Sequence, residues 1–260
     1  VDGSRSVAVG DSALIVQDPA SAVAMYNTAV GHAAGSAVTT GTLNTFVGGL
    51  AGDATTTGDH NTAVGYTSLG ANTTGTRNTS FGALAQYTAT TGDYNNAVGY
   101  GALYSLTTAD HNNAMGDTTL YANTTGAHNT GLGSAALRFS TTGHYNTAVG
   151  SNALYTATTA SNNTAVGYAS LWANTTGASN TAVGYASLYA NTTGASNVAV
   201  GKSALTACTT GGTNTAVGFQ ALTTLIGGGA NTAVGQQAGA SITTADNNTI
   251  VGMVAGSILT

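Results

Sequence analysis

The stretch 163–179, NTAVGYASLWANTTGAS, is followed at 180–196 by NTAVGYASLYANTTGAS, a second copy that differs at one position. Tandem repetition at a fixed period is the signature of a stacked architecture in which each repeat packs on its neighbours. The 17-residue unit continues in both directions without insertion or deletion, and its glycine falls at Gly31, Gly48, Gly65, Gly82, Gly99, Gly116, Gly133, Gly150, Gly167, Gly184, Gly201, Gly218, Gly235 and Gly252. The sequence therefore predicts a regular array over residues 27–260 that forms a single solenoid domain.

An irregular segment precedes this array. One further copy of the motif, SVAVG at 6–10, lies 21 residues before the next copy instead of 17. The four extra residues fall in the stretch 11–26, which also contains Pro19, the only proline of the chain. We expect residues 1–26 to form an irregular first coil with a short bulging insertion.

Each NTAVG segment is interpreted as one short strand. The residue before the glycine is Val in eleven of fourteen copies and Phe81, Met115 or Leu132 in the others, so it is always apolar. Thr stands two residues earlier in eleven copies, and the two-residue period of a strand puts Thr and Val on one face. We expect this face to point to the core and the intervening Ala to point the other way.

A second short segment and two turns complete the expected coil. Ala, Ser or Thr always lies three residues after the glycine, and Leu lies four residues after it in nine copies. A Thr-Thr pair and then Gly or Ala follow, which is typical of a turn. Asn, Thr, Gly and Val are poor helix formers, which argues against a helical repeat. The sequence thus predicts an all-β parallel β-solenoid with two short strands in each coil.

Composition and charge exclude several classes of function. Four Lys and Arg residues against nine acids give a net charge of −5, so the chain lacks the basic surface of nucleic-acid-binding proteins. No apolar run of about 18 residues is present, so we expect no membrane span in this segment. The single cysteine, Cys208, is expected to be a packed thiol. Catalytic motifs and paired catalytic carboxylates are lacking, so we expect neither enzyme activity nor a cofactor.

Asn occupies the position four residues before the glycine in all fourteen regular copies. We predict that this column forms an amide ladder, in which each side chain donates to a carbonyl of the next coil. Removal of one rung should leave a neighbour unpaired, so the predicted role is structural. The central rungs are Asn61, Asn78, Asn95, Asn112, Asn129, Asn146, Asn163, Asn180, Asn197 and Asn214.

An aromatic column five residues after the glycine is the main candidate for ligand binding. Its members are Tyr87, Tyr104, Tyr121, Tyr155, Trp172 and Tyr189, and Arg138 interrupts it. A second set directly follows the glycine: Tyr66, Tyr100, Tyr168, Tyr185 and Phe219. Exposed rows of this kind would stack against sugar rings or anchor a protein partner. The alternative is that the rings stack on one another between coils and stiffen the array.

Two polar columns flank the turn. A histidine group precedes the Asn column without a carboxylate partner, so we interpret it as solvated turn residues and expect no metal site. Its members are His60, His111 and His128. Turn formation is also the expected role of four acids that follow the turn Gly or Ala: Asp59, Asp93, Asp110 and Asp246.

The strand motif resembles that of the YadA-like head domain of trimeric autotransporter adhesins, whose repeats carry S/N-V-A-I-G. The closest matches are SVAVG at 6–10 and NVAVG at 197–201, and AVGHAAG at 29–35 and AVGQQAG at 233–239 are similar to the short coils of that family. Similar NTAVG arrays occur in fibre proteins of phages and in large bacterial surface proteins. The resemblance implies a left-handed parallel β-roll, in which three chains wrap a common axis and bind matrix or host surfaces. The longer 17-residue unit and the absence of a heptad stalk, an anchor barrel and a basic neck depart from the family.

We therefore predict a structural or adhesive segment of an extracellular fibre, on a cell surface or a virion. Its expected partners are two further copies of itself, as a homotrimer, and a host or matrix surface made of protein or glycan. A coil with one Val and one Leu as its large apolar members has little to bury alone, which favours association through apolar faces.

Two alternatives stay open. The first is a self-polymerising filament joined end to end, because the segment SILT at 257–260 shows no polar cap over the strand edges. The second is an ice-binding solenoid, suggested by the Thr columns. Adjacent Thr residues point in opposite directions if extended, and bulky Tyr residues interrupt a flat face, which both argue against ice binding.

Overall fold

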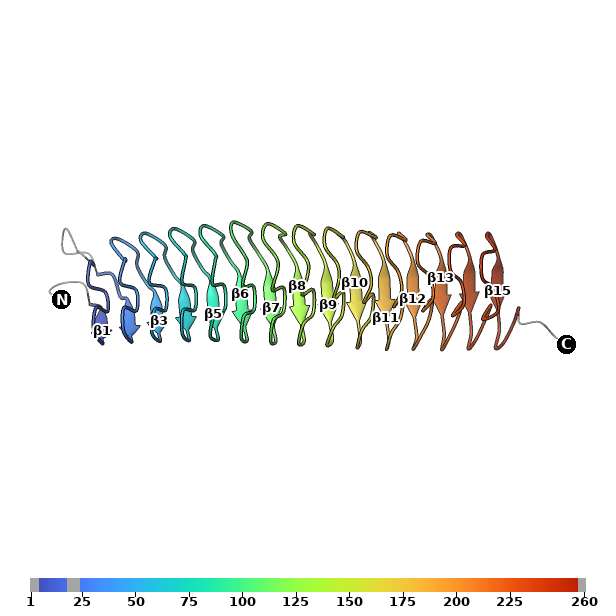
Figure 1. Ribbon diagram of the computed structural model, residues 1–260, viewed down its shortest axis with the longest axis horizontal. Helices are drawn as coiled ribbons and strands as arrows, with labels where there is room; N and C mark the ends of the chain where they lie inside the picture. Colours follow the sequence, from blue (N-terminus) through green and yellow to red (C-terminus); the bar gives the residue numbers. More distant parts are fainter. Residues whose placement is uncertain (1–4, 18–23, 257–260) are drawn as a thin grey trace. The chain divides into compact units, whose positions relative to one another are not determined.

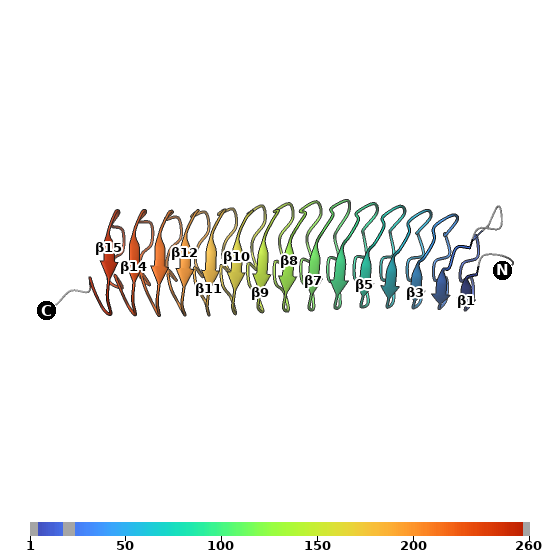
Figure 2. The same ribbon diagram turned by 180° about the vertical axis from the view of Figure 1, so that it is seen from behind.

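The computed structural model describes residues 5–17 and 24–256. The expected loop around Pro19 and the segment 257–260 lie outside the described residues. The chain divides into two compact units, Val1–His128 and Asn129–Thr260. Within the described residues each unit is a parallel β-solenoid without a helix, and successive strands lie side by side along the stack (Figures 1 and 2). The predicted fold class and coil length are confirmed.

The first unit has one strand of three residues in each coil. Its described strands are β1 (Val7–Val9), β2 (Thr28–Val30), β3 (Thr45–Val47), β4 (Thr62–Val64), β5 (Thr79–Phe81), β6 (Asn96–Val98) and β7 (Asn113–Met115). They pair in chain order and in register, so that Thr62 lies beside Thr79 and Val64 beside Phe81. Equivalent side chains of successive coils therefore form rows.

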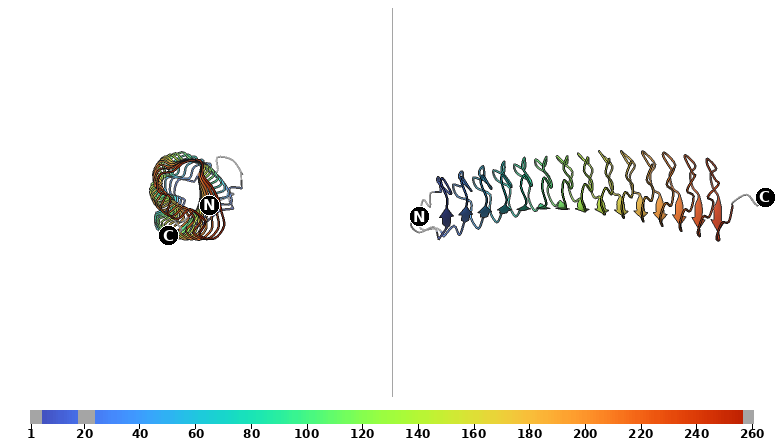
Figure 3. Two further views of the ribbon diagram at one scale, coloured as in Figure 1. Left: turned by 90° about the vertical axis from the view of Figure 1, so that its right-hand side faces the viewer. Right: turned by 60° about the horizontal axis from the view of Figure 1, so that its bottom comes forward.

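The second unit repeats this arrangement. Its described strands are β8 (Thr130–Leu132), β9 (Thr147–Val149), β10 (Thr164–Val166), β11 (Thr181–Val183), β12 (Val198–Val200), β13 (Thr215–Val217), β14 (Thr232–Val234) and β15 (Thr249–Val251). Neighbouring strands again pair parallel and in register, as Ala165 does with Ala182. In the view along the stack, the chain of each unit winds around a narrow interior (Figure 3).

The prediction of two strands in each coil is wrong. The segment after the glycine forms consecutive turns. The second and fourth residues of this segment have positive φ, for example 48° at Thr67 and 55° at Leu69. Left-handed residues bend the chain and prevent an extended strand. Hydrogen bonds between coils continue here, because the Leu69 N–H donates to the Ala85 carbonyl at 2.9 Å.

The predicted orientation of the strand faces is also wrong. Ala165 and Ala182, in the middle of β10 and β11, are fully buried, whereas Val166 and Val183 are 36% exposed. The left-handed conformation at the fourth residue after the glycine accompanies a Leu side chain that is buried in the interior, as at Leu171. With Leu in the interior, close packing leaves room for the small Ala side chain of the strand. The Val side chains therefore point away from the chain's own core.

The glycine that marks the period is required by both backbone conformation and space. Gly184 has a φ of 135°, which residues with a β-carbon rarely adopt. A β-carbon at Gly184 would lie 2.6 Å from the carbonyl oxygen of Gly201 in the next coil. The backbones of successive coils approach so closely at this column that no larger residue fits.

The Asn column lies in the interior and joins successive coils. The Asn78 Nδ2 donates to the Gly92 carbonyl at 2.7 Å, and the Asn78 Oδ1 accepts the Asn95 N–H at 2.9 Å. In the second unit, the Asn146 N–H donates to the Asn129 Oδ1 at 3.0 Å in the same way. All ten central rungs are buried. Each amide therefore links two backbone groups of the following coil.

We expect Asn78→Ala to lower the free energy of unfolding by about 2 to 4 kcal/mol, because the Asn95 N–H and the Gly92 carbonyl lose their amide partner in a buried position. Urea denaturation followed by circular dichroism measures this change. The control is Asn96→Ala, which removes the same group from an exposed side chain and should cost less than about 1 kcal/mol. Equal losses in the two variants would contradict a structural role of the buried column.

Candidate functional site

The aromatic column five residues after the glycine forms a stack of rings in each unit. In the first unit, Tyr104 lies between Tyr87, at 5.2 Å, and Tyr121, at 4.8 Å between ring centroids. In the second unit, Trp172 stacks on Tyr155 and on Tyr189, with interplanar angles of 5° and 9°. Within each stack the ring faces cover one another. A sugar ring therefore cannot lie on these faces inside the stacks, and the ring edges are the parts available to a ligand.

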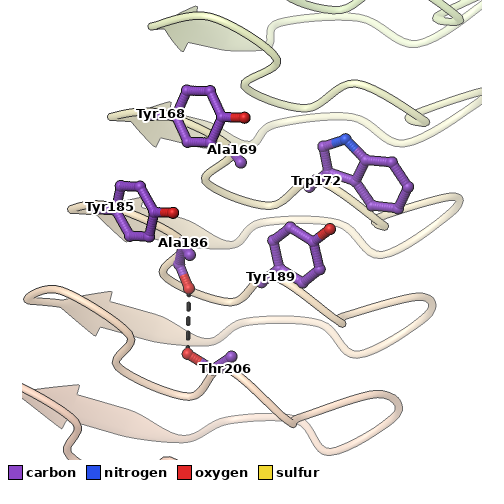
Figure 4. A pocket seen from close by; sticks show the side chains of 7 residues that line it. All are labelled: Tyr168, Ala169, Trp172, Tyr185, Ala186, Tyr189 and Thr206. Atoms are coloured by element: carbon purple, nitrogen blue, oxygen red, sulfur yellow. Dashed lines mark hydrogen bonds between the residues drawn. The ribbon is translucent and has the colours of Figure 1, made fainter.

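A second aromatic row lies beside this stack in the second unit. Tyr168 and Tyr185, which directly follow their glycines, stack at 5.4 Å and are exposed. Between this row and the pair Trp172 and Tyr189 lies a hollow of about 380 Å³, which we call the aromatic trough (Figure 4). The trough is lined by Tyr168, Ala169, Trp172, Tyr185, Ala186, Tyr189 and Thr206.

The chemistry of the aromatic trough suits an uncharged ligand with hydroxyl groups. None of its lining residues carries a formal charge at neutral pH. The tyrosine hydroxyls both donate and accept hydrogen bonds, and the indole N–H donates. The small Ala169 and Ala186 lie between the two aromatic rows and keep the trough open (Figure 4).

The histidine column forms part of a mixed stack in the first unit. The rings of His111 and His128 are parallel at 4.9 Å, and Tyr94 stacks on His111 at the same separation. The guanidinium of Arg77 donates to the Tyr94 hydroxyl at 2.9 Å. Among residues 5–17 and 24–256, no three His, Cys, Asp or Glu side chains are grouped to hold a metal ion. This column is therefore a row of turn residues that stack on one another.

The four acids after the turn connect coils through their carboxylates. Each accepts a hydrogen bond from a backbone N–H one coil earlier in the chain, at 2.6 or 2.7 Å: Asp59 from Thr42, Asp93 from Thr76, Asp110 from Asp93, and Asp246 from Gly229. These bonds occupy the carboxylates in holding the turns.

The structure also brings together residues that the sequence analysis did not select. Asp53 and Gly70 occupy the aromatic column 34 and 17 residues before Tyr87. With Leu50 and Thr67, they line a hollow of about 400 Å³ beside Tyr87. Burial raises the pKa of the Asp53 carboxyl. The 17-residue spacing was the available signal, because it assigns these two residues to the same column as the rings.

Cys208 is a buried free thiol that lies near the turn. Its sulfur donates to the Gly211 carbonyl at 3.6 Å, and burial raises the pKa of the thiol. A raised pKa keeps the thiol protonated at neutral pH and lowers its reactivity. These properties agree with the packed role expected for Cys208.

Comparisons with known proteins find no match with any family model, any curated protein sequence or any solved structure. In the described parts of the chain, no helix has the length and apolar character needed to cross a membrane. The functional argument therefore starts from the outward strand face, the aromatic rows and the hollows beside them.

Proposed function

We propose that the chain is a structural and adhesive segment of an extracellular fibre, which associates as a homotrimer and presents a repetitive surface for attachment. The observation that carries this proposal is the outward face of the strands, formed in each coil by the first and third strand residues. We call it the Thr/Val face after its commonest members. Left-handed winding and a cell-surface or virion location belong to the proposal through the resemblance of the NTAVG motif to YadA-like heads.

The Thr/Val face has the character of a surface that a partner covers. Its residues in β8–β15 are Thr, Val and Leu, none of which is charged. Val166, Val183 and Val200 are each 36% exposed, so every coil adds apolar area to the same stripe. Contiguous apolar stripes are unfavourable in water and mark association surfaces.

The repeat of this stripe indicates which partner fits it. A partner that contacts every coil must itself repeat with the coil spacing, and a further copy of the chain meets this condition. Three copies around a common axis form a closed ring of equivalent contacts, in which each Thr/Val face is covered. The small Ala-rich interior of the single coil agrees with a need for such shared burial.

We expect the wild-type chain to sediment with the mass of three chains, and the double variant Val166→Asp with Val200→Asp to dissociate at least about a hundredfold more readily. A charge buried at an interface without a partner costs about 3 kcal/mol or more, which gives this factor. Sedimentation equilibrium across a dilution series measures the mass, and circular dichroism checks the fold.

The control variant is Thr176→Asp with Thr210→Asp, which adds the same two charges to exposed turn positions in the same unit and should leave the mass of three chains unchanged. A wild-type monomer at all concentrations, or a Val166→Asp, Val200→Asp variant that is still trimeric, would overturn the trimer. A mass that rises without limit with concentration would support the end-to-end filament instead.

The adhesive part of the proposal rests on the aromatic trough. It is uncharged, lined by hydroxyl-bearing and indole side chains, and its wall residues Tyr168 and Tyr185 are exposed. Aromatic side chains supply large contact areas with a polar end, which is the usual composition of binding surfaces for glycans and protein partners.

We expect a glycan array to detect binding of a neutral glycan, and the double variant Trp172→Ala with Tyr185→Ala to weaken it at least about tenfold. One wall residue is lost from each aromatic row in this variant. Tyr145→Ala, which removes an exposed ring from a different column, is the control and should bind normally. Absence of glycan binding by the wild-type chain would remove the glycan from the proposal.

Ice binding is the second candidate, because the Thr residues that face outward are those of the strands and alternate with the buried Ala. Rows of Thr147, Thr164 and Thr181 with their Val neighbours form a regular outward surface of methyl and hydroxyl groups. This surface is the same Thr/Val face that the trimer would bury, so the two functions exclude each other.

Thermal hysteresis separates the two functions. The trimer proposal predicts no hysteresis for the wild-type chain. If the Thr/Val face binds ice, the chain will be monomeric and show hysteresis, and Thr164→Tyr will reduce it because a bulky ring breaks the regular surface. Thr176→Tyr, at an exposed turn position, is the matched control.

A further inference from the structure

The aromatic column of the first unit contains a gap. Asp53, Gly70 and Tyr87 occupy this column in three successive coils, and Tyr104 continues it by stacking on Tyr87 at 5.2 Å. Gly70 has no side chain, so the position between the Asp53 carboxylate and the Tyr87 ring is open. Tyr104 covers one side of the Tyr87 ring, and the other side is left towards Gly70.

The gap has the thickness of one small group. A β-carbon placed on Gly70 would lie 3.6 Å from Asp53 Oδ1 and 3.6 Å from Tyr87 Cδ2. The same point lies 3.2 Å from the backbone carbonyl oxygen of Thr67. A group at this point therefore contacts the carboxylate on one side and the aromatic ring on the other, within the hollow of about 400 Å³ that these residues line.

Two polar groups at the gap lack partners that would satisfy them. Thr67 is only 9% exposed, lines the hollow, and its hydroxyl oxygen is buried without a hydrogen-bond partner. Asp53 forms no salt bridge with any residue in the described part of the chain. Desolvation is the largest cause of the raised pKa of Asp53, and it exceeds the opposing effect of the backbone N–H groups of Asp53 and Ala54. A positive group in the gap would compensate this desolvation.

We propose that this gap, the Gly70 slot formed by Asp53, Thr67, Gly70 and Tyr87, binds a primary ammonium group, such as the end of a lysine side chain or of a small alkylamine. An ammonium is a compact charge with three N–H donors. The Asp53 carboxylate and the Thr67 oxygens accept these donors, and the face of Tyr87 attracts the charge. This site is independent of the trimer and of glycan binding.

Other cations fit the slot less well. A guanidinium stacked on Tyr87 directs its N–H groups within its own plane, and therefore past Asp53. A quaternary ammonium has no N–H to donate to the oxygens. Calcium requires six to eight oxygen ligands, whereas one carboxylate and the Thr67 oxygens provide too few.

Titration of the isotope-labelled chain with n-butylammonium chloride, monitored by nuclear magnetic resonance, tests the proposal. We expect saturable shifts of the Tyr87 ring signals, with a dissociation constant in the millimolar range, and contacts between the butyl protons and Tyr87. Tetramethylammonium should bind at least about threefold more weakly, because it lacks N–H donors. Potassium chloride at the same concentrations should cause no saturable shift. No saturable binding of n-butylammonium, or equal binding of tetramethylammonium, would overturn the proposal.

Nα-acetyl-lysine amide distinguishes the two sources of the ammonium group. Binding as tight as that of n-butylammonium supports a lysine side chain as the occupant, because the backbone of the lysine is then accommodated outside the slot. Binding of n-butylammonium alone supports a free alkylamine.

Three variants locate the binding. Asp53→Asn removes the charge and Gly70→Met fills the slot, and each should weaken n-butylammonium binding at least about tenfold. Asp117→Asn removes the same charge from an exposed residue of the same unit and should leave the affinity unchanged. Unchanged affinity in Asp53→Asn or in Gly70→Met, with a wild-type circular dichroism spectrum, would place the ammonium elsewhere and overturn the Gly70 slot.

Discussion

The hydrogen bonds of the buried Asn amides are the interaction on which the rest of the structure depends. Each amide accepts a backbone N–H and donates to a turn carbonyl of the following coil, as Asn78 does with Asn95 and Gly92. The amides lie in a narrow interior without charged partners, where an unpaired polar group is costly. A shift of one residue in the pairing would break these bonds in the shifted coil, so the amides fix the register of the stack.

Register is what gives each position of the repeat a collective property. A Tyr that recurs with the period becomes a stack of rings, and an outward Val becomes an apolar stripe. The same rule makes a single deviating residue conspicuous, because Gly70 interrupts a row that its neighbours define. Candidate sites of this chain are therefore properties of columns and of their interruptions.

The period, the parallel pairing and the position of the strands could be predicted from the sequence, since the glycine column and the NTAVG motif recur without a break. The second strand and the orientation of the faces could not. Both depend on left-handed backbone at positions such as Thr67 and Leu69, and neither residue type favours that conformation. The Gly70 slot was missed because its residues deviate from the aromatic type of their column, although their spacing places them in it.

In-register pairing without insertions has a consequence for how such a chain changes over generations. Each coil contacts its immediate neighbours, so stability is approximately a sum of equivalent terms along the array. Duplication or loss of one whole unit in the gene leaves the remaining joints intact, whereas a frame-preserving change of any other size displaces every amide that follows. The length of the array is therefore free to vary in steps of 17 residues, and a mosaic of surface columns can be shuffled without redesign of the interior.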